Sequence, residues 1–222
     1  MASKFYAVKF GRTPGVYKTW KECEEQTKGF KGAIFKSFAT HGEALTFVTP
    51  VAFNGLGINA DQCVIYTDGS HQRGKKYLGI GAYCQYQGVE YKMSLQCDDK
   101  MLSSYGITET ACSNPTAEFL AVAEVLRELN RSPLPFRSNI TITFMNDYIG
   151  PANWIAGNWK ANEIHIQNIL KECRILIKNI NVPVYFQHVK GHSGDHGNDQ
   201  ADKLASDHEV HSNFSALFLK LQ

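Results

Sequence analysis

Residues 64–70 read Val-Ile-Tyr-Thr-Asp-Gly-Ser, an apolar run that ends on an acidic residue and a glycine. Such a run is typical of a buried strand, and Asp68 stands where the strand gives way to a turn. A second run, 140–145, alternates with a strand period and is followed by Asn146 and Asp147. Two further acidic residues, Glu118 and Asp202, lie inside helical patterns. Carboxylates so far apart in sequence, once gathered in one cleft, would hold hard divalent cations, as two-metal phosphoryl transfer requires.

The segment around these residues alternates strands and helices from 61 to 207, which predicts an α/β domain. The first three strands are expected to form a meander with turns at 69–74 and 87–88, and the polar stretch 97–113 is expected to be a surface loop. For the apolar tail 212–222, packing as an extra helix and self-association both stay open. The patterns predict strands at 64–67, 79–86, 89–95, 140–145 and 184–189, and helices at 116–130, 164–178 and 198–207.

The first 48 residues differ in charge from the rest of the chain. They contain eight Lys/Arg and four Glu, a net charge of +4, whereas residues 61–222 contain 15 Lys/Arg and 17 Asp/Glu, a net charge of −2. A small basic domain beside an acidic one suggests a polyanion-binding module attached to a cation-holding one. The uncharged segment 49–60 is expected to be a flexible linker, which spans at most about 40 Å.

The basic module predicts a small α+β domain. Its pattern indicates strands at 4–10, 16–17 and 35–38, a helix that Thr19 and Glu22 open with a capping box and Gly29 closes, and a second helix at 40–48. Its aromatic side chains stand among lysines. They fit base stacking beside phosphate contacts, or equally a small hydrophobic core, and the pattern alone does not decide between the two.

Composition excludes several classes of protein. The hydrophobic fraction is 43% and the mean hydropathy −0.28, and no apolar stretch approaches the ~18–20 residues of a membrane span. The N-terminal residues lack the apolar region of a secretory signal. Six cysteines without a C-x-x-C pair are typical of buried, reduced thiols. We therefore expect a cytoplasmic protein, nuclear or organellar if eukaryotic, with no membrane partner.

Residues 4–48 contain the segments F-Y-A-V, G-V-Y-x-T-W and F-K-x-F-A-T, and they closely resemble the hybrid-binding domain of eukaryotic type 1 ribonucleases H. The resemblance implies that aromatic residues face the DNA strand of an RNA/DNA hybrid while basic residues contact phosphates. Ser37 stands where animal relatives often have a second lysine, so we expect weaker phosphate contact there. Double-stranded RNA stays open as a second ligand. The residues that match these roles are Tyr6, Arg12, Trp20, Phe35 and Lys36.

The rest of the chain resembles the ribonuclease H catalytic domain. The motifs T-D-G-S, N-P-T-A-E, V-K-G-H-S-G and N-D-Q-A-D occur in that family's order at residues 67–70, 114–118, 189–194 and 198–202. The resemblance implies a mixed five-stranded sheet with flanking helices over 61–210, preceded by the small domain 1–48; the tail 211–222 has no clear counterpart. It also implies endonucleolytic cleavage of the RNA strand of RNA/DNA hybrids, which leaves 5′-phosphate and 3′-hydroxyl ends.

The resemblance assigns roles to single residues. Two Mg²⁺ ions, with Mn²⁺ as a substitute, would be held by Asp68, Glu118, Asp147 and Asp202, with Asp68 as the bridging ligand. His192 would assist proton transfer or product release. Because only the 2′-hydroxyl distinguishes RNA from DNA locally, its readers are expected at Asn114, Gly69 and Ser70. We expect a monomer.

The third carboxylate is the least certain ligand in the sequence. Many relatives have T-D-S where residues 145–148 read M-N-D-Y, and the resemblance to a bacterial branch with an aspartate before a tyrosine favours Asp147. In the alternative, Asn146 occupies the ligand position and the site is inactive, which would make the chain a non-catalytic binder of hybrids or double-stranded RNA. A DNA recombinase or resolvase on the same kind of fold is a further alternative, against which the N-terminal module and the G-H-S-G loop argue.

The segment before the helix at 164–178 also departs from many relatives. Between Lys160 and Ile164 there is no room for their long basic helix, so we expect the catalytic domain alone to bind weakly. Trp154 and Trp159 fit either a groove for the DNA strand or core packing.

Overall fold

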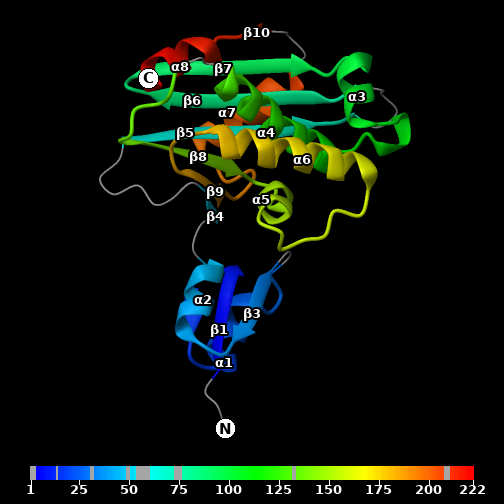
Figure 1. Cartoon of the computed structure of the whole chain (residues 1–222). Helices are drawn as coiled ribbons and strands as arrows, with labels where there is room; N and C mark the ends of the chain where they lie inside the picture. The colour runs from blue at the N-terminus through cyan, green and yellow to red at the C-terminus, as the bar shows by residue number, and fades with distance from the viewer. Residues whose placement is uncertain are drawn as a thin grey trace. The chain divides into compact units, whose positions relative to one another are not determined.

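The computed structural model describes residues 4–13, 15–30, 33–48, 51–53, 61–72, 77–131, 134–207 and 211–222. The chain divides into two compact units, 1–50 and 51–222 (Figure 1). None of the helices in these described ranges has the length and apolarity that crossing a membrane requires.

The N-terminal unit is a three-stranded antiparallel sheet in the order β2-β1-β3, accompanied by two helices. The capping box is confirmed: Thr19 Oγ1 accepts a hydrogen bond from Glu22 N, and the Glu22 carboxylate accepts one from Thr19 N at 2.9 Å. Gly29 follows the first helix with φ +72°. The elements are β1 (Phe5–Phe10), β2 (Gly15–Tyr17), α1 (Trp20–Thr27), β3 (Ile34–Phe38) and α2 (His41–Val48).

The second unit is built on a mixed seven-stranded sheet in the order β10-β7-β6-β5-β8-β9-β4. The predicted meander is confirmed by the antiparallel strands β5 (Asp61–Ser70), β6 (Gly79–Tyr86) and β7 (Val89–Gln96), and β8 (Ile140–Asn146) and β9 (Val184–His188) continue it parallel to β5. The five predicted strands are therefore all present. The predicted number was too small by two, because β4 (Val51–Phe53) and β10 (His211–Ser212) are too short to show a pattern.

Strand β4 lies inside the segment that the sequence marks as a linker. It pairs antiparallel with β9, with Val51 opposite Phe186 and Phe53 opposite Val184. The prediction of a flexible connector is wrong for these three residues, because the edge of the sheet binds their backbone. Residues 49–50 and 54–60, like residues 73–74 of the predicted turn, lie outside the described part of the chain.

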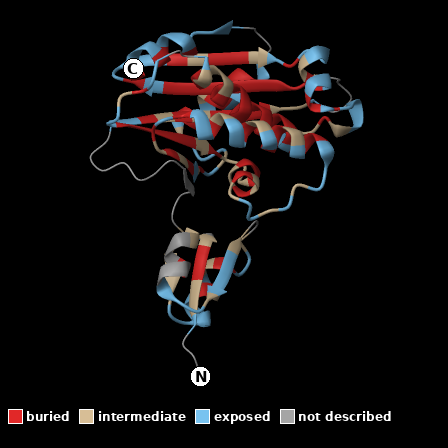
Figure 2. Cartoon of the chain, in the orientation of Figure 1, coloured by how far each residue is buried: buried red, intermediate tan, exposed pale blue. Residues whose placement is uncertain are grey.

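Helices cover both faces of the sheet (Figure 1). The large core lies between the sheet and the helices α4 (Asn114–Asn130), α6 (Ile164–Asn179) and α8 (Phe214–Leu221), and α4 is buried along most of its length (Figure 2). A smaller cluster of Tyr66, Tyr83, Ala201 and Leu204 packs α7 (His196–Ser206) on the other face. Alternate residues of β6 therefore serve different cores, as the pleat of a strand requires.

Two further segments correct or complete the predictions. The stretch 97–113 is not a loop: it contains α3 (Asp99–Tyr105) and a 3₁₀ turn (Glu109–Ala111). Asp98 caps α3 by accepting a hydrogen bond from Met101 N at 2.7 Å, and Leu102 and Tyr105 are buried. The tail packs as the extra helix α8, with Phe214, Leu217, Phe218 and Leu221 buried. Helix α5 (Gly150–Ile155) was not predicted.

Candidate functional site

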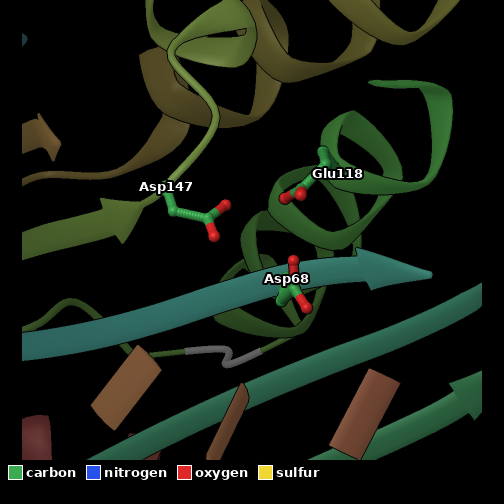
Figure 3. Close-up of side chains that lie close together, drawn as sticks. All are labelled: Asp68, Glu118 and Asp147. Atoms are coloured by element: carbon green, nitrogen blue, oxygen red, sulfur yellow. The ribbon is translucent and has the colours of Figure 1, made fainter. Parts of the chain in front are cut away.

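Three of the four predicted carboxylates meet at one end of the sheet. Asp68 lies near the end of β5, Asp147 directly follows β8, and Glu118 projects from the first turns of α4 (Figure 3). One carboxylate oxygen from each lies within 4.8 Å of the other two. The parallel pairing of β5 with β8 explains part of this geometry, since Tyr66 pairs with Met145 and each aspartate follows its paired residue by two positions.

Gly69 and Gly191 permit this close approach. A Cβ atom added to Gly69 would lie 2.1 Å from the backbone nitrogen of Glu118, so only a glycine allows the end of β5 to contact α4 there. A Cβ atom on Gly191 would lie 2.5 Å from Asp147 Oδ2. The two glycines thus leave the space in which Glu118 and Asp147 approach the end of the sheet.

The carboxylates of Asp68 and Glu118 are buried together, with 7% and 6% of each residue exposed. Burial, reinforced by the negative charges of Asp147 and Asp202, raises the pKa of Asp68 to about 6, although hydrogen bonds with Glu118 and Gly69 oppose the rise. Burial and then the charge of Asp68 also raise the pKa of Glu118 well above its ordinary value. Without a cation, the pair therefore favours a shared proton over two charges.

The donor set fits a hard divalent cation. All three groups offer oxygen, and Glu118 Oε2 is buried with no hydrogen-bond partner in the described part of the chain. A buried carboxylate oxygen without a donor is costly unless a cation binds it. The oxygens suit Mg²⁺, Mn²⁺ or Ca²⁺, so they define the class of ion and not its identity.

Asp202 and His192 lie outside this group of three. Asp202 is exposed on α7, although it is near enough for its charge to raise the pKa of Asp68. The hydrogen bond from Ser94 Oγ to Leu204 O, at 2.8 Å, holds α7 against the sheet. His192 is exposed in the loop before α7 and has φ +52°.

Asn146 and Asp147 have different surroundings. Asn146 is buried, and its Nδ2 donates a hydrogen bond to Thr67 Oγ1. The carboxylate of Asp147, by contrast, lies with those of Asp68 and Glu118. His188 Nε2 lies 3.0 Å from the carbonyl oxygen of Asp147. Sequence reasoning missed Thr67 and His188 as supports; their signal is a polar residue at the end of a buried strand.

The expected readers of the 2′-hydroxyl lie beside the carboxylates. Asn114 begins α4, and its Oδ1 accepts a hydrogen bond from His71 N at 2.8 Å, which ties the segment after β5 to the helix. Gly69 is buried and Ser70 is half-buried at the end of β5. All three therefore stand at the junction that also carries Asp68 and Glu118.

An aromatic cluster adjoins Asp147. Trp154 stacks on Phe119 of the core helix α4, with ring centroids 5.2 Å apart, so core packing accounts for Trp154. Tyr148 lies 6.0 Å from Trp154 and 6.5 Å from Trp159 between centroids. Trp159 is half-buried, and its ring centroid lies 6.0 Å from that of Trp154.

The N-terminal unit has an aromatic surface. Trp20 lies 5.8 Å from Tyr6 and 5.6 Å from Phe35 between ring centroids, and Trp20 and Phe35 are 45% and 43% exposed. These side chains are therefore not the core of the unit. Lys36 is exposed, and its Nζ lies 5.5 Å from the centre of the Phe38 ring. Arg12 is also exposed, and its guanidinium donates to Glu25 O at 2.9 Å. Among the described residues of this unit, the buried hydrophobic ones are Ala7, Val8, Cys23 and Ala44.

Comparison with known proteins matches both units. Residues 4–48 match the family described as the Ribonuclease H1 N-terminal domain, and residues 60–209 match the RNase H family. The chain is 26% identical to Ribonuclease H1 of Homo sapiens, with 90% of this chain and 87% of that protein covered. It is 31% identical to Ribonuclease H of Francisella philomiragia, with 68% and 93% covered. Its fold is similar to that of RNase H1 from the halophilic archaeon Halobacterium salinarum, with a TM-score of 0.51 at 16% identity and 67% and 97% of the two chains covered.

Proposed function

The chain belongs to the ribonuclease H family, and we propose that it cleaves the RNA strand of RNA/DNA hybrids at the carboxylates of Asp68, Glu118 and Asp147. The observation that carries this assignment is the meeting of the three groups within 4.8 Å, on the motifs of the matched family. An oxygen-only site at the end of a sheet suits metal-assisted hydrolysis of a phosphodiester.

We propose Mg²⁺ as the natural ion, with Mn²⁺ as a substitute and Asp202 as the fourth, outer ligand. Divalent cations held by Asp68, Glu118 and Asp147 would supply a nucleophilic water on one side of the phosphate and charge stabilisation at the leaving 3′ oxygen on the other. Asp68 and Glu118 would lose their shared proton when they bind a cation. His188 holds the backbone of Asp147 through the 3.0 Å contact with its carbonyl. His192, exposed before α7, would carry a proton or help release a product with 5′-phosphate and 3′-hydroxyl ends.

The remaining assignments concern recognition. The exposed aromatic surface of Tyr6, Trp20 and Phe35 supports stacking on the DNA strand, with phosphates at Arg12 and Lys36. The position of Asn114 beside Glu118 supports a contact with the 2′-hydroxyl, together with the end of β5 at Gly69 and Ser70. Double-stranded RNA is a second ligand under this proposal, and the protein acts as a cytoplasmic monomer.

The deciding experiment compares the parent with Asp147→Asn on an end-labelled RNA/DNA hybrid in Mg²⁺, in Mn²⁺ and in EDTA. We expect the parent to cut only the RNA strand, and the variant to cut no faster than the EDTA control. Asp199→Asn, an exposed change on α7, is the matched control and keeps full activity. A parent that binds the hybrid without cutting it in either ion would be a binding protein. Cleavage of duplex DNA would favour a recombinase instead.

A further inference from the structure

A groove of about 650 Å³ lies between the segment 159–161 and α6. Three cationic residues line it, namely Lys160, Lys171 and Arg174, and none of the described residues that line it is acidic. Its other lining includes the apolar side chains of Trp159, Leu170 and Ile175. The groove thus combines positive charge with apolar surface.

The positive charges of this groove are not neutralised by the protein. Lys160 and Lys171 are exposed, and neither forms an ion pair in the described ranges. Glu163 is near in sequence, but it contacts His165 at 3.3 Å. Arg174 is fixed in place, because its Nη2 donates to Trp154 O at 3.2 Å and to Ile155 O at 3.4 Å. An anionic ligand therefore finds three cations available without breaking an ion pair.

The apolar surface restricts the class of anion. Ile175 is 52% exposed, and Trp159 is half-buried, so both offer apolar area to a ligand. A nucleic acid duplex presents phosphates outward and keeps its bases stacked inside, which leaves such area without a partner. Unpaired nucleotides present phosphates and flat base faces together.

The groove is also close to the carboxylates. Tyr148 follows Asp147 directly in the chain, and its ring centroid lies 6.5 Å from that of Trp159. Tyr148 thus links Asp147 to Trp159, which lines the groove.

We propose that this groove binds a single-stranded segment of nucleic acid that adjoins the hybrid, with bases against Trp159 and Ile175 and phosphates at Lys160, Lys171 and Arg174. The inference rests on the proposed function in one respect, namely that the hybrid occupies the carboxylate site. It predicts a preference for hybrids with single-stranded extensions over blunt ones.

The test measures binding separately from cleavage. Fluorescein-labelled dT12 and rU12 are titrated in EDTA with the full chain and with the groove variant Lys160→Glu/Lys171→Glu. The matched control Lys100→Glu/Lys178→Glu has the same change in charge at exposed lysines outside the groove. All proteins carry Trp20→Ala, because the N-terminal aromatic surface is a second place for bases. Thermal melting checks that each variant is folded.

We expect the groove variant to bind the oligonucleotides at least about tenfold more weakly, because two lysines that would contact phosphates are replaced by negatively charged residues. The affinity of the control variant for the oligonucleotides should differ from that of the parent by less than about twofold. A hybrid with a 12-nucleotide extension should bind the parent more tightly than a blunt hybrid does, and the groove variant should lose this difference while it cuts the blunt hybrid at the parental rate.

Equal binding of dT12 by the groove variant and the control would overturn the inference. So would displacement of labelled dT12 by poly-glutamate as effective as displacement by unlabelled dT12, because poly-glutamate offers negative charge without bases. Failure of the proposed function is a separate result. In that case no hybrid is cut by any of the proteins, whereas the difference in dT12 binding between groove variant and control remains.

Discussion

Asp68 and Glu118 are buried side by side, so ionising both carboxylates without a cation costs free energy. The pKa of Asp68 is raised from 3.8 to about 6, so between these values the folded metal-free protein binds more protons than the unfolded chain. The contribution of Asp68 to stability is therefore most favourable below this window and declines as the pH rises through it. A shift of this size corresponds to about 3 kcal/mol.

We predict that Asp68→Asn stabilises the metal-free protein at pH 8 by up to about 3 kcal/mol, because the amide carries no charge to bury. The measurement is the melting temperature in EDTA from pH 5 to pH 8, for parent and variant. The curves should converge toward pH 5, and added Mg²⁺ should raise the parent's melting temperature more than the variant's. A variant that is less stable than the parent at pH 8 would contradict the electrostatic account.

Gly191 gives a second prediction for a single residue. A methyl group there would lie 2.5 Å from Asp147 Oδ2, so Gly191→Ala displaces that carboxylate and lowers kcat, while hybrid binding changes little. Gly194→Ala is the control in the same loop: its added Cβ meets nothing within 4 Å, and φ +79° makes it mildly strained. We expect Gly194→Ala to cost about 1 kcal/mol of stability and to keep most activity. Equal losses of kcat in both variants would assign the effect to the loop backbone instead.

Single residues also show how far the sequence predicts the site. Asp68 was predictable because it ends an apolar run, and the second run, 140–145, pointed to Asn146 or Asp147 without deciding between them. The contact of Glu118 with Asp68 depends on the space that Gly69 leaves, which no periodicity reveals. The choice between Asn146 and Asp147 depends on which side of β8 faces Thr67, and neighbouring residues of a strand point to opposite sides.

At the scale of elements, long periodic segments were predictable and short ones were not. The three long helices α4, α6 and α7 and the five main strands follow from apolar spacing. Helix α3 has seven residues and depends on the Asp98 cap and on Gly106, at φ +70°, to begin and end. The short strands β4 and β10 exist through backbone pairing with β9 and β7, which leaves little trace in their side chains.

Helix α8 provides a matched pair of substitutions. Leu217 is 0% exposed and Leu219 is 73% exposed on the same helix. Leu217→Ala should therefore cost about 2–5 kcal/mol of unfolding free energy through the cavity it leaves, whereas Leu219→Ala should change it by less than about 0.5 kcal/mol. Urea denaturation of both variants measures the difference. Equal effects would mean that α8 is not packed as an integral part of the core.

For the whole molecule, the proposed function assigns substrate affinity to the first unit and phosphodiester hydrolysis to the second. Trp20 is exposed in the first unit, and the three carboxylates belong to the second. Trp20→Ala should weaken hybrid binding by roughly 1–3 kcal/mol, the usual effect of losing one stacked base, and leave kcat unchanged at saturating substrate. The measurements are Kd in EDTA and the kcat and KM values in Mg²⁺, with the exposed Leu134→Ala as control. A lower kcat with an unchanged Kd would place Trp20 in the chemical step.

The pairing of β4 with β9 has a consequence for how such sequences diverge. Helix α2 ends at Val48 and β4 begins at Val51, so only residues 49–50 separate the N-terminal unit from the sheet, whereas residues 54–60 lead from one strand of that sheet to another. The three peptide units from Val48 to Val51 span at most about 11 Å. Insertions at 49–50 would lengthen the connection between the two units, and insertions at 54–60 would lengthen only the connection from β4 to β5. Length differences among related chains should therefore fall into two classes. Those at 49–50 should change hybrid binding and those at 54–60 should not, although both lie within one stretch of uncharged sequence.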